Sequence, residues 1–322
     1  MKKIIFIIFV FLFLPNFVSA DVIVSGPISS DTTWSPPNVY VIDTSFSVAS
    51  GTTLTIEPGT IIKAKSTWYG GPSIYGKLVA HGTSESPIIF TSQNGEINGW
   101  QGLYFKQGSE GDFDFVDISY AGYGGDGFGN FVGIENDGGV VDIKNSNIHD
   151  NFKIINNGGG GLMSVGSGIY NKSGTLSVSD SVIDNNVVGI RIDSGAANIS
   201  NNIIKNNDDS TGYSRGYGVY AISPEPLTLT NNSFLGNGRT AYIDASKNFT
   251  HSGNTSGDKT NRGFEMNGII TNNTTLSGND LPFIIGSLTI NGTLTIEPGT
   301  ILKMSDYYSS GSITVNGNLI AN

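Results

Sequence analysis

The chain has 322 residues, of which 17 are basic and 27 acidic, and its formal net charge is −10. A surface of this sign repels nucleic acid and anionic lipid, so neither is a favoured partner. The sequence has no cysteine, which excludes disulfides, thiol nucleophiles, cysteine metal sites and a lipoprotein anchor, and favours a bacterial source for an exported protein of this size.

Residues 1–20 have the pattern of a secretory signal peptide. A short basic start precedes an uninterrupted apolar run, Ile4–Leu14, and the small residues Ser19 and Ala20 follow as a cleavage site. The run is shorter than the roughly 20 residues that cross a bilayer as a helix. We therefore predict a mature chain that begins at Asp21, has no transmembrane segment, and is secreted or held at the cell surface.

Residues 21–38 contain Trp34 and the pair Pro36-Pro37, and are predicted to form a leader that caps the first coil. From Val39 onward the chain consists of short apolar runs separated by Gly, Asn and Asp. None of these runs keeps the i, i+3, i+4 spacing of an amphipathic helix. We therefore predict strands and tight turns with essentially no helix.

A long repeat links the two ends of the chain. Residues 51–63 read GTTLTIEPGTIIK and residues 291–303 read NGTLTIEPGTILK, so matching positions lie 240 residues apart. In each copy an alternating strand with Leu and Ile on one face is followed by a Pro-Gly turn and a second apolar pair. Identity of this length predicts a repeat protein.

A shorter repeat occupies the middle third. The segments VDIKNSNI, LSVSDSVI, ANISNNII and LTLTNNSF begin at residues 141, 176, 197 and 227 and align without gaps. Between them lie short strands that start with glycine: GIY, GIR and GVY, from residues 168, 189 and 218. The shortest interval is 21 residues, between Val178 and Ile199. A period near twenty residues with two or three strands is what a parallel β-helix requires.

Stacked coils place equivalent residues above one another at about 4.8 Å. Positions such as Leu54 and Ile56 would then fill an apolar interior. The Asn or Asp of each short repeat would form a ladder at one corner, where Asn tolerates left-handed backbone and its amide bonds to the neighbouring coils. This ladder explains the Asn pairs without a catalytic role. The predicted ladder consists of Asn145, Asp180, Asn201 and Asn231.

The sequence resembles the secreted bacterial right-handed parallel β-helix proteins of the pectin-lyase-like superfamily. The matching strings are GTTLTIEPGTIIK, GKLVAHGT, PIIFTS, WQGLYF and FVDISYAG, which lie in order between residues 51 and 122. The resemblance implies an all-β solenoid of about a dozen coils over residues 39–322. The superfamily contains lyases and hydrolases as well as adhesins and surface proteins of no known activity, so it implies no single function.

The second long copy stops at Asn322, at the point where the first copy proceeds to PIIFTS. A bare last coil would leave an unpaired strand edge, which solenoid proteins normally cap. We therefore expect the native chain to continue past Asn322.

A β-helix hydrolase needs an acid and a base held on one face. In the superfamily the acids resemble Asn-Thr-Asp and Asp-Asp pairs, supported by Gly-His-Gly and Arg-x-Lys. This chain has neither supporting motif. Its counterparts to the acids are Asp208 and Asp209, and the competing interpretation is a solvated loop.

A lyase needs a carboxylate cluster for calcium and an Arg or Lys base. The candidates are Asp180, Asp184, Arg191 and Asp193, which would share one face if the coils stack as predicted. Ordinary solubilising charges are the alternative. Calcium is expected only for a lyase. We otherwise predict no cofactor and no metal site, because the glycine-rich segment 124–129 lacks the final Asp of a calcium-binding repeat.

Aromatic residues beside Gly or Ser are candidates for contact with glycans, because Tyr and Trp faces cover the C–H faces of sugars. They can instead cap the interior or lie on neighbouring coils. The candidate ligand-binding residues are Trp68, Tyr69, Tyr120, Tyr123, Tyr213 and Tyr217.

Three functions are compatible with these patterns. We favour a secreted or cell-surface structural and binding protein that contacts polysaccharide or a surface through an exposed strand face and its loops. The alternative is a polysaccharide lyase or glycoside hydrolase, which a clustered set of Asp and Arg on stacked coils would indicate. The third is a scaffold that binds nothing.

Overall fold

The computed structural model describes residues 21–65, 71–122, 131–156, 162–208, 216–305 and 311–321, with no side-chain description for 44, 45, 153–156 and 162–165. The predicted signal peptide at 1–20 lies outside the described residues. Within the described ranges the chain consists of strands and turns without a helix, so no helix there is long and apolar enough to cross a membrane.

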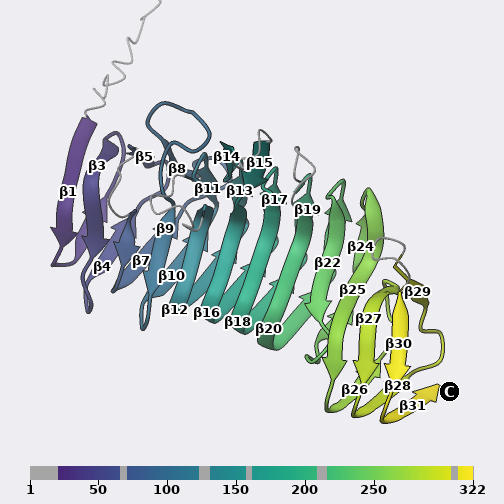
Figure 1. The fold of residues 1–322 in the computed structure, drawn as a ribbon. Coiled ribbons are helices and arrows are strands. Elements are labelled where there is room, and N and C mark those ends of the chain that lie inside the picture. Colours follow the sequence, from purple (N-terminus) through teal and green to yellow (C-terminus); the bar gives the residue numbers. More distant parts are fainter. Residues whose placement is uncertain are drawn as a thin grey trace, which may run out of the picture.

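Parallel strands lie above one another in three stacks that follow one axis (Figure 1). Long strands bend and contribute to two stacks. Stack 1 contains β1 (Asp21–Ile28), β3 (Val39–Val48), β5 (Ile61–Ala64), β8 (Ile88–Ser92), β11 (Val116–Ser119), β13 (Asn147–His149), β17 (Val182–Asp184), β19 (Ile203–Lys205), β21 (Ser233–Leu235) and β24 (Thr255–Gly257).

Stack 2 runs through the whole described chain. It contains the second halves of β1 and β3, then β6 (Ser73–Ile74), β9 (Leu103–Lys106), β12 (Val132–Lys144), β16 (Ser167–Ser179), β18 (Val188–Ser200), β20 (Tyr217–Thr230), β22 (Arg239–Asp244), β25 (Thr260–Ile270), β27 (Phe283–Ile290) and β29 (Leu302–Met304).

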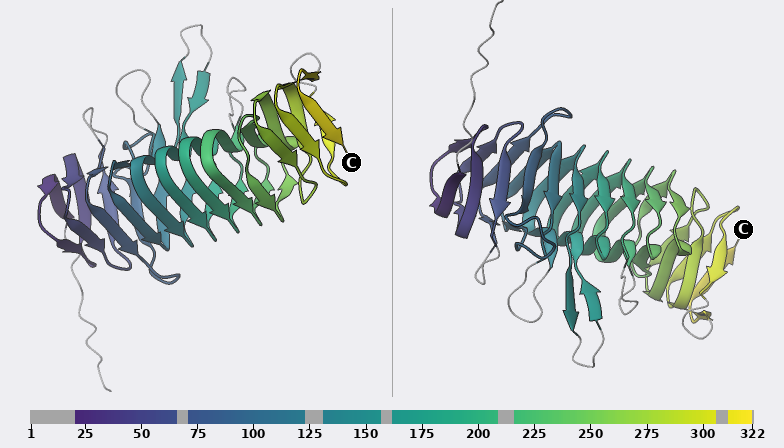
Figure 2. Two further views of the ribbon diagram at one scale, coloured as in Figure 1. Left: turned by 90° about the horizontal axis from the view of Figure 1, so that it is seen from below. Right: turned by 90° about the horizontal axis from the view of Figure 1, so that it is seen from above.

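Stack 3 contains β2 (Thr32–Trp34), β4 (Thr53–Ile56), β7 (Lys77–His81), β10 (Glu110–Asp114), the second halves of β12, β16, β18 and β20, and β23 (Thr250–Ser252). The antiparallel hairpin of β14 (Lys153–Asn156) and β15 (Leu162–Val165) projects from the side of the rod, as Figure 2 shows. The predicted parallel β-helix is thereby confirmed. Its first coil includes β1 and β2, so the segment predicted as a leader is itself a coil that pairs with β3 and β4.

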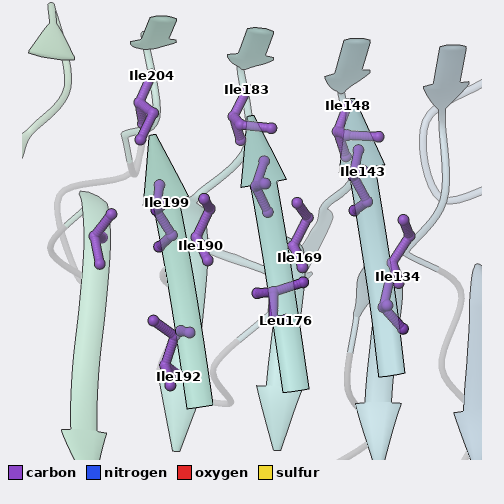
Figure 3. Packing of buried hydrophobic residues seen from close by; sticks show 14 of the residues in the cluster. Ile134, Ile143, Ile148, Ile169, Leu176, Ile183, Ile190, Ile192, Ile199 and Ile204 are labelled. Atoms are coloured by element: carbon purple, nitrogen blue, oxygen red, sulfur yellow. The ribbon is translucent and has the colours of Figure 1, made fainter. Parts of the chain in front are cut away.

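The apolar core lies inside the three stacks and is built from matching positions on successive coils. Figure 3 shows isoleucines from all three stacks meeting there, for example Ile183 of stack 1, Ile190 of stack 2 and Ile199 of stack 3, each fully buried. The strand period of two directs alternate side chains inward. Leu54 and Ile56, which the sequence placed in the interior, are each 1% exposed.

The corner between stacks 3 and 1 turns at Asn or Asp. Asn145, Asp180, Asn201 and Asn231 occupy it with φ of 48°, 52°, 59° and 55°, the left-handed region that Asn and Asp tolerate best. Their side chains are exposed. The buried ladder is formed instead by the residue that follows each of them, because the left-handed residue turns the chain and the next side chain points into the coil.

Two buried ladders result, one at each end of stack 1. In the second, the backbone N–H and Nδ2 of Asn207 both donate to Oδ1 of Asn237, at 2.9 Å each, and Asn237 donates in the same way to Asp258. The amides therefore all point in one direction and each ladder ends on a carboxylate. The first ladder is Ser146, Ser181, Asn202, Asn232, Asn254 and Asp280, and the second is Asn151, Asn186, Asn207, Asn237 and Asp258.

The stacks change near the C-terminal third. β24 is the last described strand of stack 1, whereas stack 2 continues through β25, β27 and β29. Two new stacks join it: the second halves of β25 and β27 with β30 (Ser312–Val315), and β26 (Asn273–Leu276) with β28 (Thr293–Ile296) and β31 (Asn318–Ala321). We call this change of stacks the seam.

Candidate functional site

The outward face of stack 2 has aromatic and charged side chains at one register position on successive coils. Their neighbours in sequence, such as Ile134, Ile169 and Ile190, point into the core. We call these outward residues the outer row. It consists of Tyr104, Glu135, Tyr170, Arg191, Tyr220, Tyr242 and Glu265.

The middle of the outer row is held by Asp193. Its carboxylate accepts hydrogen bonds from Nε and Nη2 of Arg191 at 2.8 and 3.0 Å and from the Tyr170 hydroxyl at 2.6 Å. The Arg191 guanidinium lies 4.8 Å from the centre of the Tyr170 ring. Burial, followed by the hydrogen bond to Asp193, raises the pKa of Tyr170, so its hydroxyl stays protonated and donates.

A pocket of about 390 Å³ lies on the C-terminal part of this face, at the seam. Three tyrosines form one side. The rings of Tyr220 and Tyr242 stack at 4.7 Å with an angle of 18° between their planes, and the Tyr217 ring lies 5.2 Å from that of Tyr220. The pocket is lined by Tyr217, Tyr220, Tyr242, Glu265, Asn267, Gly286 and Ser287.

Beside the tyrosines lies a buried ion pair. Arg239 and Glu265 have side chains that are 5% and 1% exposed, and Nη1 of Arg239 donates to Oε2 of Glu265. Nδ2 of Asn261 donates to the same oxygen at 3.0 Å. The guanidinium also lies 5.6 Å from the centre of the Tyr217 ring. Burial lowers the pKa of Arg239, but Tyr217 and Glu265 outweigh it and the net direction is upward, so the guanidinium stays charged.

The other wall comes from neighbouring strands. The backbone N–H of Ser287 donates to Oδ1 of Asn267 at 2.8 Å. A Cβ added at Gly286 would overlap that oxygen. Glycine at 286 therefore lets the Asn267 amide lie against the backbone of β27.

Residues 26–134 match the family model described as a pectate-lyase like beta helix domain. The described strands form a parallel β-helix, and the match fits a pectin-lyase-like fold over the segment that it covers. Comparisons with curated proteins and with solved structures gave no match. The matched segment ends at Ile134, so the pocket lies outside it.

The residues predicted as a lyase cluster lie on different parts of the coils. Arg191 and Asp193 are paired on stack 2, whereas Asp184 lies on stack 1, where Lys205 is 3.2 Å away. Asp180 is at the exposed corner before β17. The predicted set thus belongs to two stacks because the turn after β17 changes the direction of the chain. In the described ranges no three His, Asp or Glu side chains are grouped as metal ligands.

The two candidates for a hydrolase lie in and beside a segment that the structure describes in part. Asp208 forms an ion pair with Nζ of Lys259 at 2.5 Å. Asp209 lies outside the described residues.

Of the predicted aromatic contacts, Tyr217 lines the pocket. Tyr120 directly follows β11 of stack 1, with its ring 6.1 Å from that of His149. Trp68, Tyr69, Tyr123 and Tyr213 lie outside the described residues. Sequence reasoning missed Tyr220, Tyr242 and Glu265 of the outer row. For Tyr220 the available signal was the third residue of the short glycine-led strands, which also holds Tyr170 and Arg191.

His149 gives the stability of the β-helix a pH dependence. Burial alone would lower its pKa, but hydrogen bonds with Asp117 and Asp150 outweigh burial and raise the pKa to about 9. The folded pKa exceeds the unfolded pKa of about 6.5. Protonated His149 therefore contributes its full stabilisation below about pH 6.5, and this contribution is lost as the pH rises through the folded pKa.

We therefore expect the free energy of unfolding to fall between about pH 6.5 and about pH 9. Urea denaturation at intervals across this range measures it, and His149→Gln should flatten the profile. An equally steep profile in the variant would exclude His149 as the cause.

Proposed function

We propose that the protein is a secreted or cell-surface binding protein that holds a polysaccharide or cell-surface glycan on the outer row, with the tyrosine pocket as the main contact. The observation that carries this proposal is the pocket itself. Its volume of about 390 Å³ accommodates a sugar ring, and three tyrosines line it beside an acid and an amide. Aromatic faces with a few fixed polar groups are typical of ligand sites.

The chemistry of the pocket supports binding more than cleavage. Its described lining contains one carboxylate, Glu265, which Arg239 engages in an ion pair. Glycoside hydrolases generally use two carboxylates on opposite sides of the scissile bond. A carboxylate fixed in a buried ion pair is also poorly suited to exchange protons with a substrate.

The test is electrophoresis of residues 21–322 through gels cast with different polysaccharides. A binding protein migrates more slowly in the gel that contains its ligand. Tyr242→Ala should reduce the retardation, which corresponds to a roughly tenfold lower apparent affinity, because it removes an aromatic face that stacks on the sugar. Tyr75→Ala is the matched control, since Tyr75 is 48% exposed and does not line the pocket.

Each outcome separates the candidate functions. Retardation that Tyr75→Ala keeps and Tyr242→Ala loses supports the proposal. A zone of depolymerised polysaccharide would show that the protein is an enzyme. Migration unaffected by any polysaccharide would contradict the proposal and favour a scaffold that binds no glycan.

A further inference from the structure

Two polar groups of the pocket have no hydrogen-bond partner in the described structure. The three donors to Glu265, from Arg239, Asn261 and Tyr217, all reach Oε2, and Oε1 accepts none. Asn267 accepts from Ser287 through Oδ1, and its Nδ2 donates to no described group. Both residues line the pocket. The site thus presents one free acceptor and one free donor.

The free acceptor is open to the pocket. Glu265 is 1% exposed as a residue, and its Oε1 is not among the buried, unpaired side-chain atoms of the described residues, so this oxygen is accessible from the pocket. A hydroxyl group entering the pocket would donate to Oε1. A C–H group would leave it unsatisfied.

The free donor is Nδ2 of Asn267, because the orientation of this amide is fixed by Ser287. The Ser287 N–H requires an oxygen at 2.8 Å, so the amide of Asn267 turns its oxygen to the backbone and its Nδ2 away from it. Glu265 and Asn267 are two residues apart on β25, and alternate residues of a strand share a face. The acceptor and the donor are therefore on the same side of the sheet.

The charge of the pocket selects among ligands. Arg239 already neutralises Glu265, and its guanidinium lies over the Tyr217 ring. A cationic sugar would meet that guanidinium, whereas a uronic acid would bring a carboxylate to Oε1 in a protein of net charge −10. Hydroxyl groups satisfy both free atoms without adding charge.

We propose that the pocket recognises an uncharged sugar ring through its hydroxyl groups, one donating to Oε1 of Glu265 and one accepting from Nδ2 of Asn267, with the tyrosines against the ring. This selectivity rests on the proposed glycan binding and excludes polyuronates and amino-sugar polymers as ligands.

Isothermal titration of residues 21–322 with a panel of neutral, uronic-acid-containing and amino-sugar polysaccharides tests the selectivity. Salt sufficient to screen surface charges removes non-specific attraction to cationic polymers. We expect binding to at least one neutral polysaccharide and none to polygalacturonate or chitosan. Preference for either charged polymer would overturn the assignment of an uncharged sugar.

Asn267→Asp tests the donor, because it keeps an acceptor for Ser287 and replaces Nδ2 with a carboxylate oxygen. Affinity for the neutral polysaccharide should fall at least about tenfold. Asn248→Asp, an exposed site outside the pocket, makes the same change in charge and should bind as the unaltered protein does. Equal affinity of Asn267→Asp and Asn248→Asp would contradict the role of Asn267.

Gly286→Ala provides an independent variant. The backbone of Gly286 is outside the left-handed region, so alanine causes no backbone strain there. The added Cβ instead clashes with the end of the Asn267 side chain. Displacing the amide should lower affinity by a similar factor while thermal unfolding shows a folded protein. If the unaltered protein binds no polysaccharide, the proposed function fails as well. If it binds and these variants bind equally well, the sugar assignment alone fails.

Discussion

Replacing Arg239 with methionine is expected to destabilise the β-helix by about 3–5 kcal/mol, because it leaves the Glu265 carboxylate buried without a countercharge. Glu265 is 1% exposed and accepts a hydrogen bond from Nη1 of Arg239 in an ion pair. The midpoint of urea denaturation measures the loss. Further replacement of Glu265 with leucine should recover much of it, since removing both charges removes the unpaired one.

Lys247→Met is the matched control for Arg239→Met. Lys247 pairs with Glu225, whose side chain is 73% exposed, and an ion pair open to water contributes little to stability. A loss at Arg239 no larger than the loss at Lys247 would show that water reaches Glu265 in solution.

Replacing Asn207 with alanine should have a comparable effect, about 3 kcal/mol or more. The substitution removes the donor to the Ile183 carbonyl and the acceptor for Asn186, and it also takes a donor from Asn237. Each buried group left unsatisfied costs about 1–3 kcal/mol. Urea denaturation again measures the change.

The adjacent Asn206→Gly is the control for the ladder. Asn206 has φ of 52° and an exposed side chain, and glycine keeps that backbone conformation without strain. We expect a change below about 1 kcal/mol from loss of its bond to Asp184. Equal effects at positions 206 and 207 would show that the ladder is not the source of stability.

The fold could be predicted from the sequence because strand alternation and coil length are both local properties. Leu54 and Ile56 were placed inside by their spacing, and the structure buries them. The long repeat and the short repeats each supply strands that pair in parallel. The pattern therefore specified a parallel β-helix without knowledge of which strands are neighbours.

The ladder shows where spacing alone is insufficient. Asn201 and Asn202 are the same residue type, and their periodicity is identical. Which one points inward depends on the left-handed backbone at Asn201, with φ of 59°, and a sequence does not specify this between two adjacent asparagines. The predicted ladder therefore consisted of the corner residues rather than the residues that follow them.

The pocket was harder to predict because aromatic residues were sought in loops. Tyr220 and Tyr242 instead lie in strands, where their neighbours Val219 and Ala241 are core residues. Only stacking in three dimensions turns single tyrosines on separate coils into a surface. Glu265 lies next to them at the seam, and the sequence repeats do not indicate where the seam occurs.

Because of the seam, two segments of nearly identical sequence lie on different sides of the β-helix. β29 follows the second LTIEPGT segment as β5 follows the first, yet β5 pairs with the start of β3 in stack 1 and β29 pairs within stack 2. Two nearly identical modules of one rod are thus presented at different azimuths around its axis. Gain or loss of a single short strand is enough to rotate every later module. In such an architecture, small insertions and deletions can reorient a binding surface while the contacts within each module stay the same.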